Sequence, residues 1–391
     1  MEGWKTKTLG EITSFMAKGI PPKYVEHEGS GIIRVLNQKC NRDYKISYAD
    51  SRLHNNSLKK APKSKMLKPG DVLINSTGAG TAGRVAQIWN VPVPTTIDGH
   101  MILLRPTEEI DALYYGYALK SYQSLIESYA EGSTGQTEIN KERLKNETVI
   151  SFPADQNSQR AIARTLAAID DKIDENERIN KNLQVQAYAI FSKAYDASTD
   201  QRPFTSIIKI LGGGTPKTGN SAYWNGPIPF FTPKDVGDPY AFLTEKCITE
   251  SGLEHCNSHL YPVNTSFVTA RGTVGKVSLA GIPMAMNQSC YALVSDVINP
   301  LMVYFYVLKA VTSLKHKASG AVFDAIVTRD FDTEIINVLS DSDNQHVLEV
   351  ITPMMNAIHN NAMENIRLSA LRDALLPRLV SGEIDVSDIT L

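Results

Sequence analysis

Apolar residues in one central segment of the chain recur on an alternating four-three spacing. The segment runs from Asp155 to Asp196, is rich in charged residues and contains no glycine. This spacing is the seam by which two helices pack lengthwise, and a forty-residue helix is about 60 Å long at 1.5 Å per residue. The pattern therefore predicts a long helix that needs a partner helix. Its seam positions are Ile162, Leu166, Ile169, Ile173, Leu183, Ala187 and Ile190, with Asn176 and Asn180 in the two gaps.

A second seam with the same gaps lies 185 residues farther along the chain. A polar residue at a seam position costs stability but fixes register. The matched asparagines therefore favour a helix pair within the chain over ordinary helical core, and they either fix its register or form a solvent-facing notch. Pro353 interrupts this seam, so the second helix either bends there or begins there with Thr352 as its N-cap. The seam positions are Val347, Ile351, Met354, Ile358, Leu368, Arg372 and Leu375, with Asn361 and Asn365 in the gaps.

The regions before the two helices also repeat. The distance between matching segments falls from 196 residues to 185 along the chain, as expected of a duplicated domain whose second copy has lost a few loop residues. The matches include Gly19-Ile20-Pro21 with Gly214-Thr215-Pro216, Leu67-Lys68-Pro69 with Leu260-Tyr261-Pro262, Thr81-Ala82-Gly83-Arg84-Val85 with Thr273-Val274-Gly275-Lys276-Val277, and Leu119-Lys120 with Leu308-Lys309.

Each copy reads as an α+β domain followed by a long helix. Short β-like runs such as 71–74, 101–104 and 266–269 are separated by Gly, Pro and Asn, and residues 112–130 and 301–317 are helical in pattern. We predict two duplicated, mostly antiparallel mixed α/β domains separated by two long antiparallel coiled-coil helices, with pseudo-twofold symmetry. The predicted boundaries are 1–154 and 198–342 for the domains, and 155–197 and 343–391 for the helices.

Composition narrows the class of protein. Hydrophobic residues make up 42% and charged residues 21% of the 391 residues, and the net charge is −2, as in an ordinary soluble protein. No apolar run is long enough for a membrane span and the first residues have no signal-peptide core, so we expect a cytoplasmic protein without a membrane partner. Residues 1–70 nevertheless hold 14 Lys and Arg against 6 Asp and Glu. Such an excess is typical either of a phosphate-facing surface or of a solvated face.

Two motifs suggest enzymatic or metal chemistry, and neither is convincing. Gly78-Ala79-Gly80-Thr81-Ala82-Gly83 has the spacing of a dinucleotide-binding loop, but a β-like run with two prolines follows it instead of a helix. Cys247, His255, Cys256 and His259 lack the paired spacing of zinc ligands. We therefore predict tight turns at the glycines, no metal, no cofactor in this chain and no catalytic constellation.

The order of several short motifs, taken with the duplication, resembles the specificity subunit of type I restriction-modification systems over the whole chain. The first domain departs from the family pattern, because Arg34-Val35-Leu36-Asn37 stands where the second has a fuller signature. The motifs are Gly214-Thr215-Pro216-Lys217, Tyr223-Trp224, Thr232-Pro233-Lys234-Asp235, Pro69-Gly70-Asp71-Val72-Leu73, Gln159-Arg160-Ala161-Ile162, Ile169-Asp170-Asp171-Lys172-Ile173 and the run from Leu375 to Ile384.

The resemblance implies a bacterial or archaeal DNA-recognition subunit without catalysis of its own. Each target recognition domain would read one half of a bipartite, asymmetric site in double-stranded DNA, and the helix pair would set the spacing. The helices would also dock two copies of a DNA adenine methyltransferase subunit that carries S-adenosylmethionine, and an ATP-dependent restriction or translocase subunit can join them. Outward helix positions expected to face the methyltransferase are Ala163, Ala167, Tyr188 and Met355.

Polar residues in the loops are the expected DNA contacts, because Arg, Lys, Asn and Gln read groove edges while Ser and Thr hold phosphates. Asp235 is expected to orient a loop, since its charge opposes phosphate. The candidates are Arg34, Asn37, Gln38, Asn75, Arg84, Ser133, Thr134 and Gln136 in the first domain, and Lys217, Tyr223, Lys234, Arg271, Lys276 and Gln288 in the second.

Two alternatives belong to other classes of function. A standalone DNA-modifying enzyme would bind S-adenosylmethionine or transfer methyl groups as the purified chain. A protein-interaction scaffold that does not use DNA would show no salt-dependent duplex binding, even with its partner.

Overall fold

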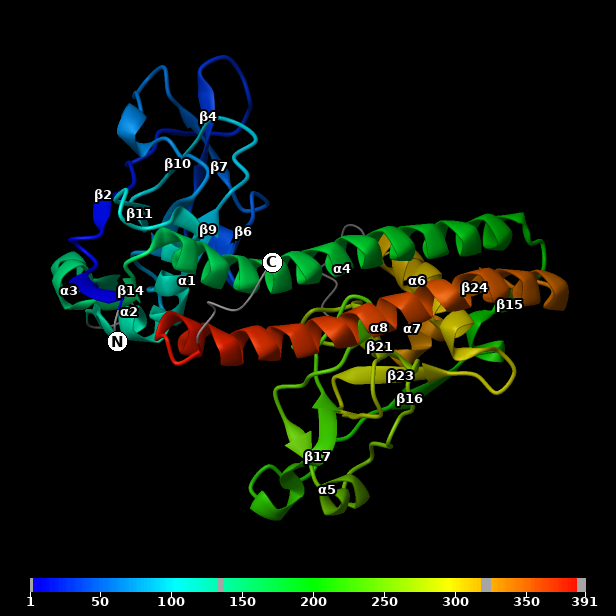
Figure 1. Cartoon of the computed structure of the whole chain (residues 1–391). Helices are drawn as coiled ribbons and strands as arrows, with labels where there is room; N and C mark the ends of the chain where they lie inside the picture. The colour runs from blue at the N-terminus through cyan, green and yellow to red at the C-terminus, as the bar shows by residue number, and fades with distance from the viewer. Residues whose placement is uncertain (1–2, 133–136, 318–324, 385–391) are drawn as a thin grey trace. The chain divides into compact units, whose positions relative to one another are not determined.

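The computed structural model describes residues 3–132, 137–317 and 325–384. Two compact units divide the chain: one holds residues 1–171 and 368–391, and the other holds residues 172–367. Each unit contains one globular domain together with part of both long helices, α4 (Gln156–Ala197) and α8 (Asp341–Val380) (Figure 1). The prediction of two α+β domains and two long helices is confirmed.

The globular domain of the first unit has two four-stranded sheets. The inner sheet, in the order β2-β11-β8-β9, packs against α1, and the outer sheet, β10-β4-β7-β3, lies beyond it, away from α4 (Figure 1). The strands are β1 (Trp4–Thr8), β2 (Thr13–Lys18), β3 (Tyr24–Val25), β4 (Ile32–Leu36), β5 (Asn41–Arg42), β6 (Lys45–Ile46), β7 (Arg52–Asn55), β8 (Asp71–Asn75), β9 (Val85–Ile88), β10 (Thr95–Ile97), β11 (Met101–Pro106), β12 (Ala130–Glu131), β13 (Glu138–Ile139) and β14 (Val149–Pro153). The helices are α1 (Ala112–Ser121), α2 (Gln123–Ser128) and α3 (Lys141–Glu147).

The globular domain of the second unit has a five-stranded sheet, β16-β23-β20-β21-β18, that packs against α6, and a three-stranded sheet, β19-β17-β22. Its strands are β15 (Gln201–Pro203), β16 (Lys209–Gly212), β17 (Trp224–Phe231), β18 (Tyr240–Ala241), β19 (Cys247–Ile248), β20 (Ser266–Thr269), β21 (Val277–Ala280), β22 (Ala285–Met286), β23 (Cys290–Val294) and β24 (Ile335–Asn337). Its helices are α5 (Glu250–Glu254), α6 (Pro300–Lys317) and α7 (Thr328–Asp332).

The strand orders show the duplication directly. The neighbours β2-β11-β8-β9 correspond in order to β16-β23-β20-β21, and β10-β4-β7 corresponds to β22-β17-β19. In both outer sheets the pair at one edge is parallel, β10 with β4 and β22 with β17. In both domains the first strand pairs antiparallel with the last, β1 with β14 and β15 with β24. Two unrelated domains would not share this order and these strand directions.

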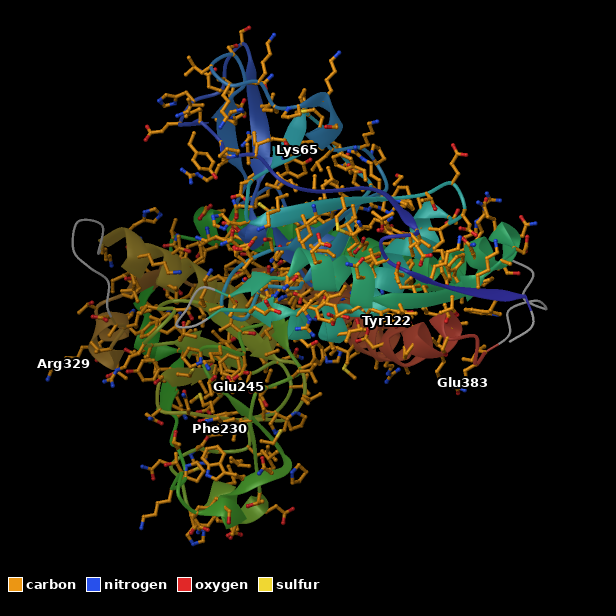
Figure 2. All side chains as sticks on the ribbon, turned by 90° about the vertical axis from the view of Figure 1, so that its left-hand side faces the viewer. Lys65, Tyr122, Phe230, Glu245, Arg329 and Glu383 are labelled. Carbon is orange, nitrogen blue, oxygen red and sulfur yellow. The ribbon has the colours of Figure 1, made fainter. Side chains whose placement is uncertain are left out.

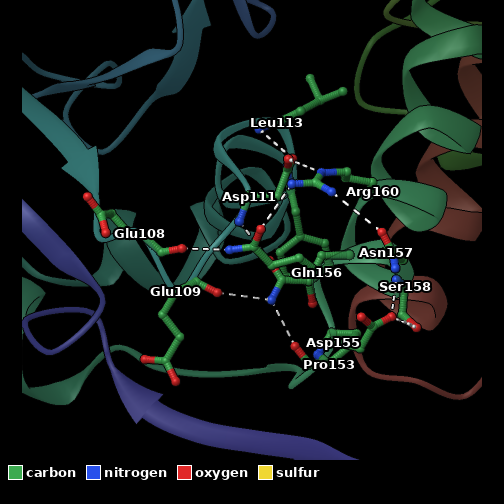
Figure 3. Close-up of polar contacts among 12 residues, drawn as sticks. Glu108, Glu109, Asp111, Leu113, Pro153, Asp155, Gln156, Asn157, Ser158 and Arg160 are labelled. Carbon is green, nitrogen blue, oxygen red and sulfur yellow. Dashed lines mark hydrogen bonds and ion pairs between the residues drawn. The ribbon is translucent and has the colours of Figure 1, made fainter.

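The start of α4 is anchored to the loop before α1 (Figure 3). Asp155 accepts a hydrogen bond from the backbone N–H of Ser158 at 2.9 Å and so caps the helix. The side chain of Gln159 is fully buried; its Nε2 donates to the Pro153 carbonyl at 2.8 Å, and its Oε1 accepts from the backbone N–H of Asp111 at 2.7 Å. Arg160 reaches the Asp111 carboxylate at 3.3 Å. These contacts fix the direction in which the helix leaves its domain.

Within the second unit, α4 and α8 run antiparallel and are joined by an asparagine ladder. Asn176 Nδ2 donates to Asn365 Oδ1 at 2.8 Å, and Asn361 Nδ2 donates to Asn180 Oδ1 at 2.9 Å. The offset of 185 converts one bond into the other, so the ladder has a local twofold axis. Asn365 and Asn180 also donate to the carbonyls of Ile173 and Ile358, at 3.3 and 3.4 Å. Because each bond fits only one register, the ladder specifies how the helices align.

Pro353 lies inside α8 and does not start it. The helix begins at Asp341, where the Ser340 hydroxyl accepts from the backbone N–H of Asp343 at 3.1 Å. The alternative in which Thr352 caps the helix is wrong; its hydroxyl donates back to the Leu348 carbonyl at 2.6 Å. Pro353 is exposed, so water can satisfy the carbonyl that loses its partner, and the helix continues past the ring.

Two helix positions expected to face outward are buried. Met355 has no exposed area while Met354 is half-buried, because the buried residues of α8 step as Val347, Ile351, Met355 and Ile358. A straight helix has 3.6 residues per turn, so its buried stripe drifts off a strict heptad repeat. Ala163 is also fully buried, since the first turns of α4 pack into the core of the first domain. Neither residue can be part of a docking surface.

The seam of the first unit contains Arg372 in place of an apolar residue. Its guanidinium donates to Asp170 of α4 at 2.7 Å, and Tyr117 of α1 donates to the same carboxylate at 2.8 Å. Buried neighbours in this part of the helix pair are Ile162, Leu166, Leu376 and Leu379. Asp170 therefore links α4 to α8 through Arg372 and to α1 of the globular domain through Tyr117, next to an apolar core. The remaining predicted seam positions, Ile169, Leu183, Ile190, Leu368 and Leu375, are half-buried, while Ile173 and Ala187 are buried.

Candidate nucleic-acid interface

Each globular domain carries one lobe that lies away from the helices of its own unit (Figure 1). The first outer lobe consists of the sheet β10-β4-β7-β3 and its loops, residues 19–40, 48–66 and 91–100. The second outer lobe consists of the sheet β19-β17-β22 with α5 and its loops, residues 214–234, 244–262 and 284–289. Figure 2 marks Lys65 in the first of these lobes and Phe230 and Glu245 in the second. Most of the predicted contact residues lie in or beside these lobes.

The second outer lobe contains a pocket of about 410 Å³. Trp224 and Phe230 form its aromatic part and meet edge to face at 5.6 Å between ring centroids. Lys246 Nζ lies 5.6 Å from the centre of the Trp224 ring, a distance at which a cation is attracted to the ring face. The amide side chains of Asn287 and Gln288 line the same pocket. An aromatic floor beside cations and amides has the chemistry of nucleotide recognition.

The Thr232–Asp235 loop borders this pocket and is ordered by its own carboxylate. Asp235 accepts from the backbone N–H and the hydroxyl of Thr232 at 2.8 and 2.6 Å, and from the backbone N–H of Glu245 at 2.7 Å. Asp235 thus orients the loop, as its sequence context predicts. Lys234 is left on the surface, where it pairs with Glu245 at 3.0 Å and its hydrogen bond lowers the pKa of that carboxyl.

The other predicted contacts of the second domain are exposed or half-buried. Tyr223 stacks on His255 with ring centroids 5.0 Å apart, and the Lys217 carbonyl accepts from the Trp224 indole at 3.2 Å. Gln288 is held by the hydroxyl of Thr215. Arg271 and Lys276 flank the turn before β21 and are exposed. Their side chains are therefore available to a partner.

The first domain uses several of its predicted contacts for internal structure. Asn75 is fully buried; its Nδ2 donates to the Gln38 carbonyl at 3.1 Å, and its Oδ1 accepts from Asn41 at 3.2 Å. Asn37 accepts from the Lys39 N–H at 2.9 Å and donates to the Asp50 carbonyl at 2.7 Å. Both asparagines order loops of the lobe, and Asn75 has no surface that DNA could touch.

Three candidates of the first domain keep some exposed surface. Arg34 pairs with Glu28 and reaches the Ser51 hydroxyl at 3.5 Å. Arg84 donates to the Gly80 carbonyl at 3.1 Å, and Gln38 is half-buried. Ser133, Thr134 and Gln136 lie outside the residues that the structure describes.

The glycine motif forms a tight turn in both domains. Gly80 and Gly83 have φ of +67° and +89°, and their counterparts Gly272 and Gly275 have +82° and +70°. These angles favour glycine. A strand follows each turn, β9 or β21. A helix whose N-terminus could hold a pyrophosphate is therefore not present at this place, in agreement with the prediction of a turn.

A polar pocket of about 530 Å³ lies between α1, α2 and α8 of the first unit. Lys120 lines it with a side chain that is only 12% exposed, 3.8 Å from Asp170. Its ammonium also lies 4.3 Å from the centre of the Tyr44 ring. Burial lowers the pKa of Lys120 to about 8, although Asp170 opposes this shift. The domain therefore holds a partly desolvated charge against the helix pair.

Metal clusters and membrane spans are both missing from the residues whose placement the structure gives. Among them no group of three or more His, Cys, Asp or Glu side chains is arranged to hold a metal ion. No helix in those ranges combines the length and the apolar character that crossing a bilayer requires.

Comparison with known proteins identifies the duplicated domains. The family model for the type I restriction modification DNA specificity domain matches residues 1–185 and 200–368, once for each globular domain with the helix that follows it. The chain belongs to this family. It carries two DNA specificity domains, and the resemblance seen in the sequence is confirmed.

Individual relatives agree with this assignment. The specificity subunit of type I restriction enzyme MjaIX from Methanocaldococcus jannaschii is 27% identical over 172 residues, which cover 42% of this chain and 40% of the relative. The chain thus spans less than half the length of that relative. The putative MjaX specificity subunit of the same organism is 21% identical over 433 residues, covering 98% of this chain and 97% of the relative. The S subunit structure from M. genitalium has the same fold, with a TM-score of 0.58 at 17% identity and 96% coverage of both chains.

Some surface residues of the two specificity domains were not predicted from the sequence. Trp224 and Lys246 line the pocket of the second outer lobe, and several exposed lysines lie in the first. The excess of basic residues in 1–70 indicated the lysines as a group. Their positions could not be derived, because loops with no periodic pattern connect them.

Proposed function

We propose that the chain is the DNA-recognition subunit of a type I restriction-modification complex and that each specificity domain reads one half of a bipartite, asymmetric site in double-stranded DNA. The observation that carries this proposal is the repetition of one outer lobe on two domains that share a helix pair. Modular DNA readers use duplicated modules in this way, with one half-site for each module.

The side chains of the two outer lobes support different half-sites. The second lobe has a pocket with Trp224, Phe230 and Lys246. At the corresponding place the first lobe has Arg34 on β4, paired with Glu28, and Arg52 stacked 3.4 Å above the Tyr24 ring. Because base edges are distinguished by the pattern of donors, acceptors and methyl groups, surfaces that differ this much select different sequences. The recognised site is therefore asymmetric.

The helix pair suits a spacer between the half-sites. Helix α4 has 42 residues and α8 has 40, and the asparagine ladder allows only one alignment. In this proposal a helix pair with one register gives a fixed number of base pairs between the two half-sites. Inserting whole heptads is the matching perturbation, since it keeps the seam in phase.

The chemistry of modification belongs to partner subunits in this proposal. Two copies of a DNA adenine methyltransferase subunit bind this chain and supply S-adenosylmethionine and the methyl transfer, and an ATP-dependent restriction subunit can join the complex. Support comes from the family, since the MjaIX and MjaX relatives are specificity subunits of restriction enzymes. The chain contributes the choice of sequence.

The test is to express the chain with a type I adenine methyltransferase from the same genome in a host without other adenine methylation. Single-molecule sequencing of the host DNA then maps the modified adenines. We expect one motif of two short, different half-sites separated by a gap of constant length, and no such motif without this chain. Methylation that does not depend on this chain, or a single continuous motif, would contradict the proposal.

A further inference from the structure

The first outer lobe has a group of lysines whose backbone positions are tied together. This lysine patch consists of Lys23, Lys59, Lys60, Lys63 and Lys65, on the segments 19–23 and 59–65. Lys59 Nζ donates to the Pro21 carbonyl at 3.1 Å, and Lys65 Nζ donates to the Gly19 carbonyl at 3.0 Å. The buried ring of His54 bonds the Lys23 N–H at 2.8 Å and the Lys59 carbonyl at 2.7 Å. The two segments are thus held side by side.

The charge of this patch is not balanced by neighbouring acids in the sequence. Residues 51–70 contain six Lys and Arg and no Asp or Glu. Lys23, Lys60 and Lys63 are exposed, and across the described part of the chain their side chains make no hydrogen bond or ion pair. Such ammonium groups face water, at the edge of a lobe whose proposed ligand is a polyanion.

The same place in the second domain has the opposite charge. The match of Leu67-Lys68-Pro69 with Leu260-Tyr261-Pro262 sets 51–70 against 244–263, a stretch with one Lys and three Glu. Both stretches include the strand that pairs with the long strand of the outer sheet, β7 with β4 and β19 with β17. The equivalent segments 51–70 and 244–263 therefore carry charges of +6 and −2, counting only Lys, Arg, Asp and Glu.

We infer that the lysine patch is an anchor for the phosphate backbone of duplex DNA and that the two arms divide the work unequally. The first domain supplies most of the sequence-independent, salt-dependent affinity, while the corresponding surface of the second domain supplies little. This inference rests on the proposed DNA recognition. Its physical basis is the release of counterions: each phosphate neutralised by Lys or Arg adds about 0.9 to the slope of log K against log salt.

The test uses the assembled complex with its methyltransferase subunits and two duplexes, one with the target and one scrambled. Binding is measured between about 50 and 300 mM salt for the triple variant Lys23→Gln, Lys60→Gln and Lys63→Gln. These three side chains have no hydrogen bond or ion pair to the described residues, so the variant keeps the bonds of Lys59 and Lys65. We expect the slope on the scrambled duplex to fall by about 2 to 3, as three lost phosphate contacts predict, with the preference for target over scrambled DNA kept.

Two matched variants complete the test. Lys217→Gln, Lys234→Gln and Lys246→Gln remove the same charge from the second outer lobe. Because Lys234 and Lys246 line the pocket proposed to read bases, this variant should weaken binding to the target duplex but change the slope on scrambled DNA by less than about 1. The triple Lys→Arg variant of the first lobe should keep the slope. An unchanged slope in the first-lobe Gln variant, or equal changes for both lobes, would overturn the inference. A complex that does not prefer its target at all would instead overturn the proposed function.

Discussion

The asparagine ladder makes a sharp prediction about the helix pair. Asn176 has no exposed area and donates to Asn365 Oδ1 at 2.8 Å. Replacing Asn176 alone by leucine leaves Asn365 Oδ1 without its donor between the helices, which costs about 1 to 3 kcal/mol. Replacing Asn365 alone costs less, because Asn176 Nδ2 keeps a second bond, to Glu364 Oε2 at 2.7 Å. Replacing both gives two apolar side chains in contact, and such a change is nearly neutral or stabilising.

The double-mutant cycle of Asn176→Leu and Asn365→Leu should therefore have a coupling free energy of about 1 to 3 kcal/mol, which favours the Asn–Asn and Leu–Leu pairs over the two mixed pairs. Hydrogen–deuterium exchange of peptides that cover 170–183 and 355–368 measures it, because local opening of the second unit is then followed separately from unfolding of the first. The symmetry-related pair Asn180 and Asn361, bonded at 2.9 Å, provides the matched cycle.

Additive single-mutant effects would refute the ladder. If each Leu substitution weakened protection independently, with no coupling in either cycle, the two asparagines would not form a bonded pair. The assignment of the ladder as the element that fixes register would then be wrong.

Three further perturbations follow from the structure. Lys120→Met should raise the melting temperature at pH 7, and the gain should shrink as the pH rises from about 8 towards 10.5. Burial lowers the pKa of Lys120 to about 8, below its value in the unfolded chain. The free energy of unfolding of the unsubstituted protein therefore increases with pH in this window, by at most about 1.4 kcal/mol per pH unit. A difference in melting temperature between the two proteins that does not change with pH would contradict this. Gly83→Ala should destabilise the first unit by more than about 1 kcal/mol, because its φ is +89° and an added Cβ would lie 2.6 Å from the Glu127 Cα. Gly80→Ala, with φ +67° and open space around the Cβ, is the control and should lower the free energy of unfolding in urea by only about 1 kcal/mol. Equal losses for the two variants would argue against the packing of this turn on α2. Inserting one heptad into both α4 and α8 should lengthen the gap in the methylated motif and leave both half-sites unchanged, and a gap of the same length would rule out the spacer role.

The sequence predicted the repeated elements well, because periodic patterns report local geometry. The strand runs at 71–74, 101–104 and 266–269 appear as β8, β11 and β20, and the asparagines in the two seam gaps bond as a ladder. Gly80, Gly83 and their counterparts were recognisable as turns because the residues that follow them are β-like. In each case the residues that determine the local structure lie close together in the sequence or occupy equivalent positions in the two copies of the repeat.

Features that depend on tertiary contacts were harder to predict. Met355 is buried instead of Met354 because the helix drifts off the heptad, and Pro353 is tolerated because its ring faces solvent. Asn75 reads as a loop contact, yet Asn41, 34 residues away in the chain, bonds it in the interior. The pocket with Trp224 and Lys246 joins residues from several loops, and no spacing rule connects them.

The central claim is that two independent arms read two different half-sites. Exchanging residues 198–342 for the second specificity domain of a relative with another target, and mapping the methylated adenines of the resulting complex, tests it most directly. We expect the half-site of the second domain to change while the first half-site and the gap remain the same. A change in both half-sites, or in neither, would contradict the account.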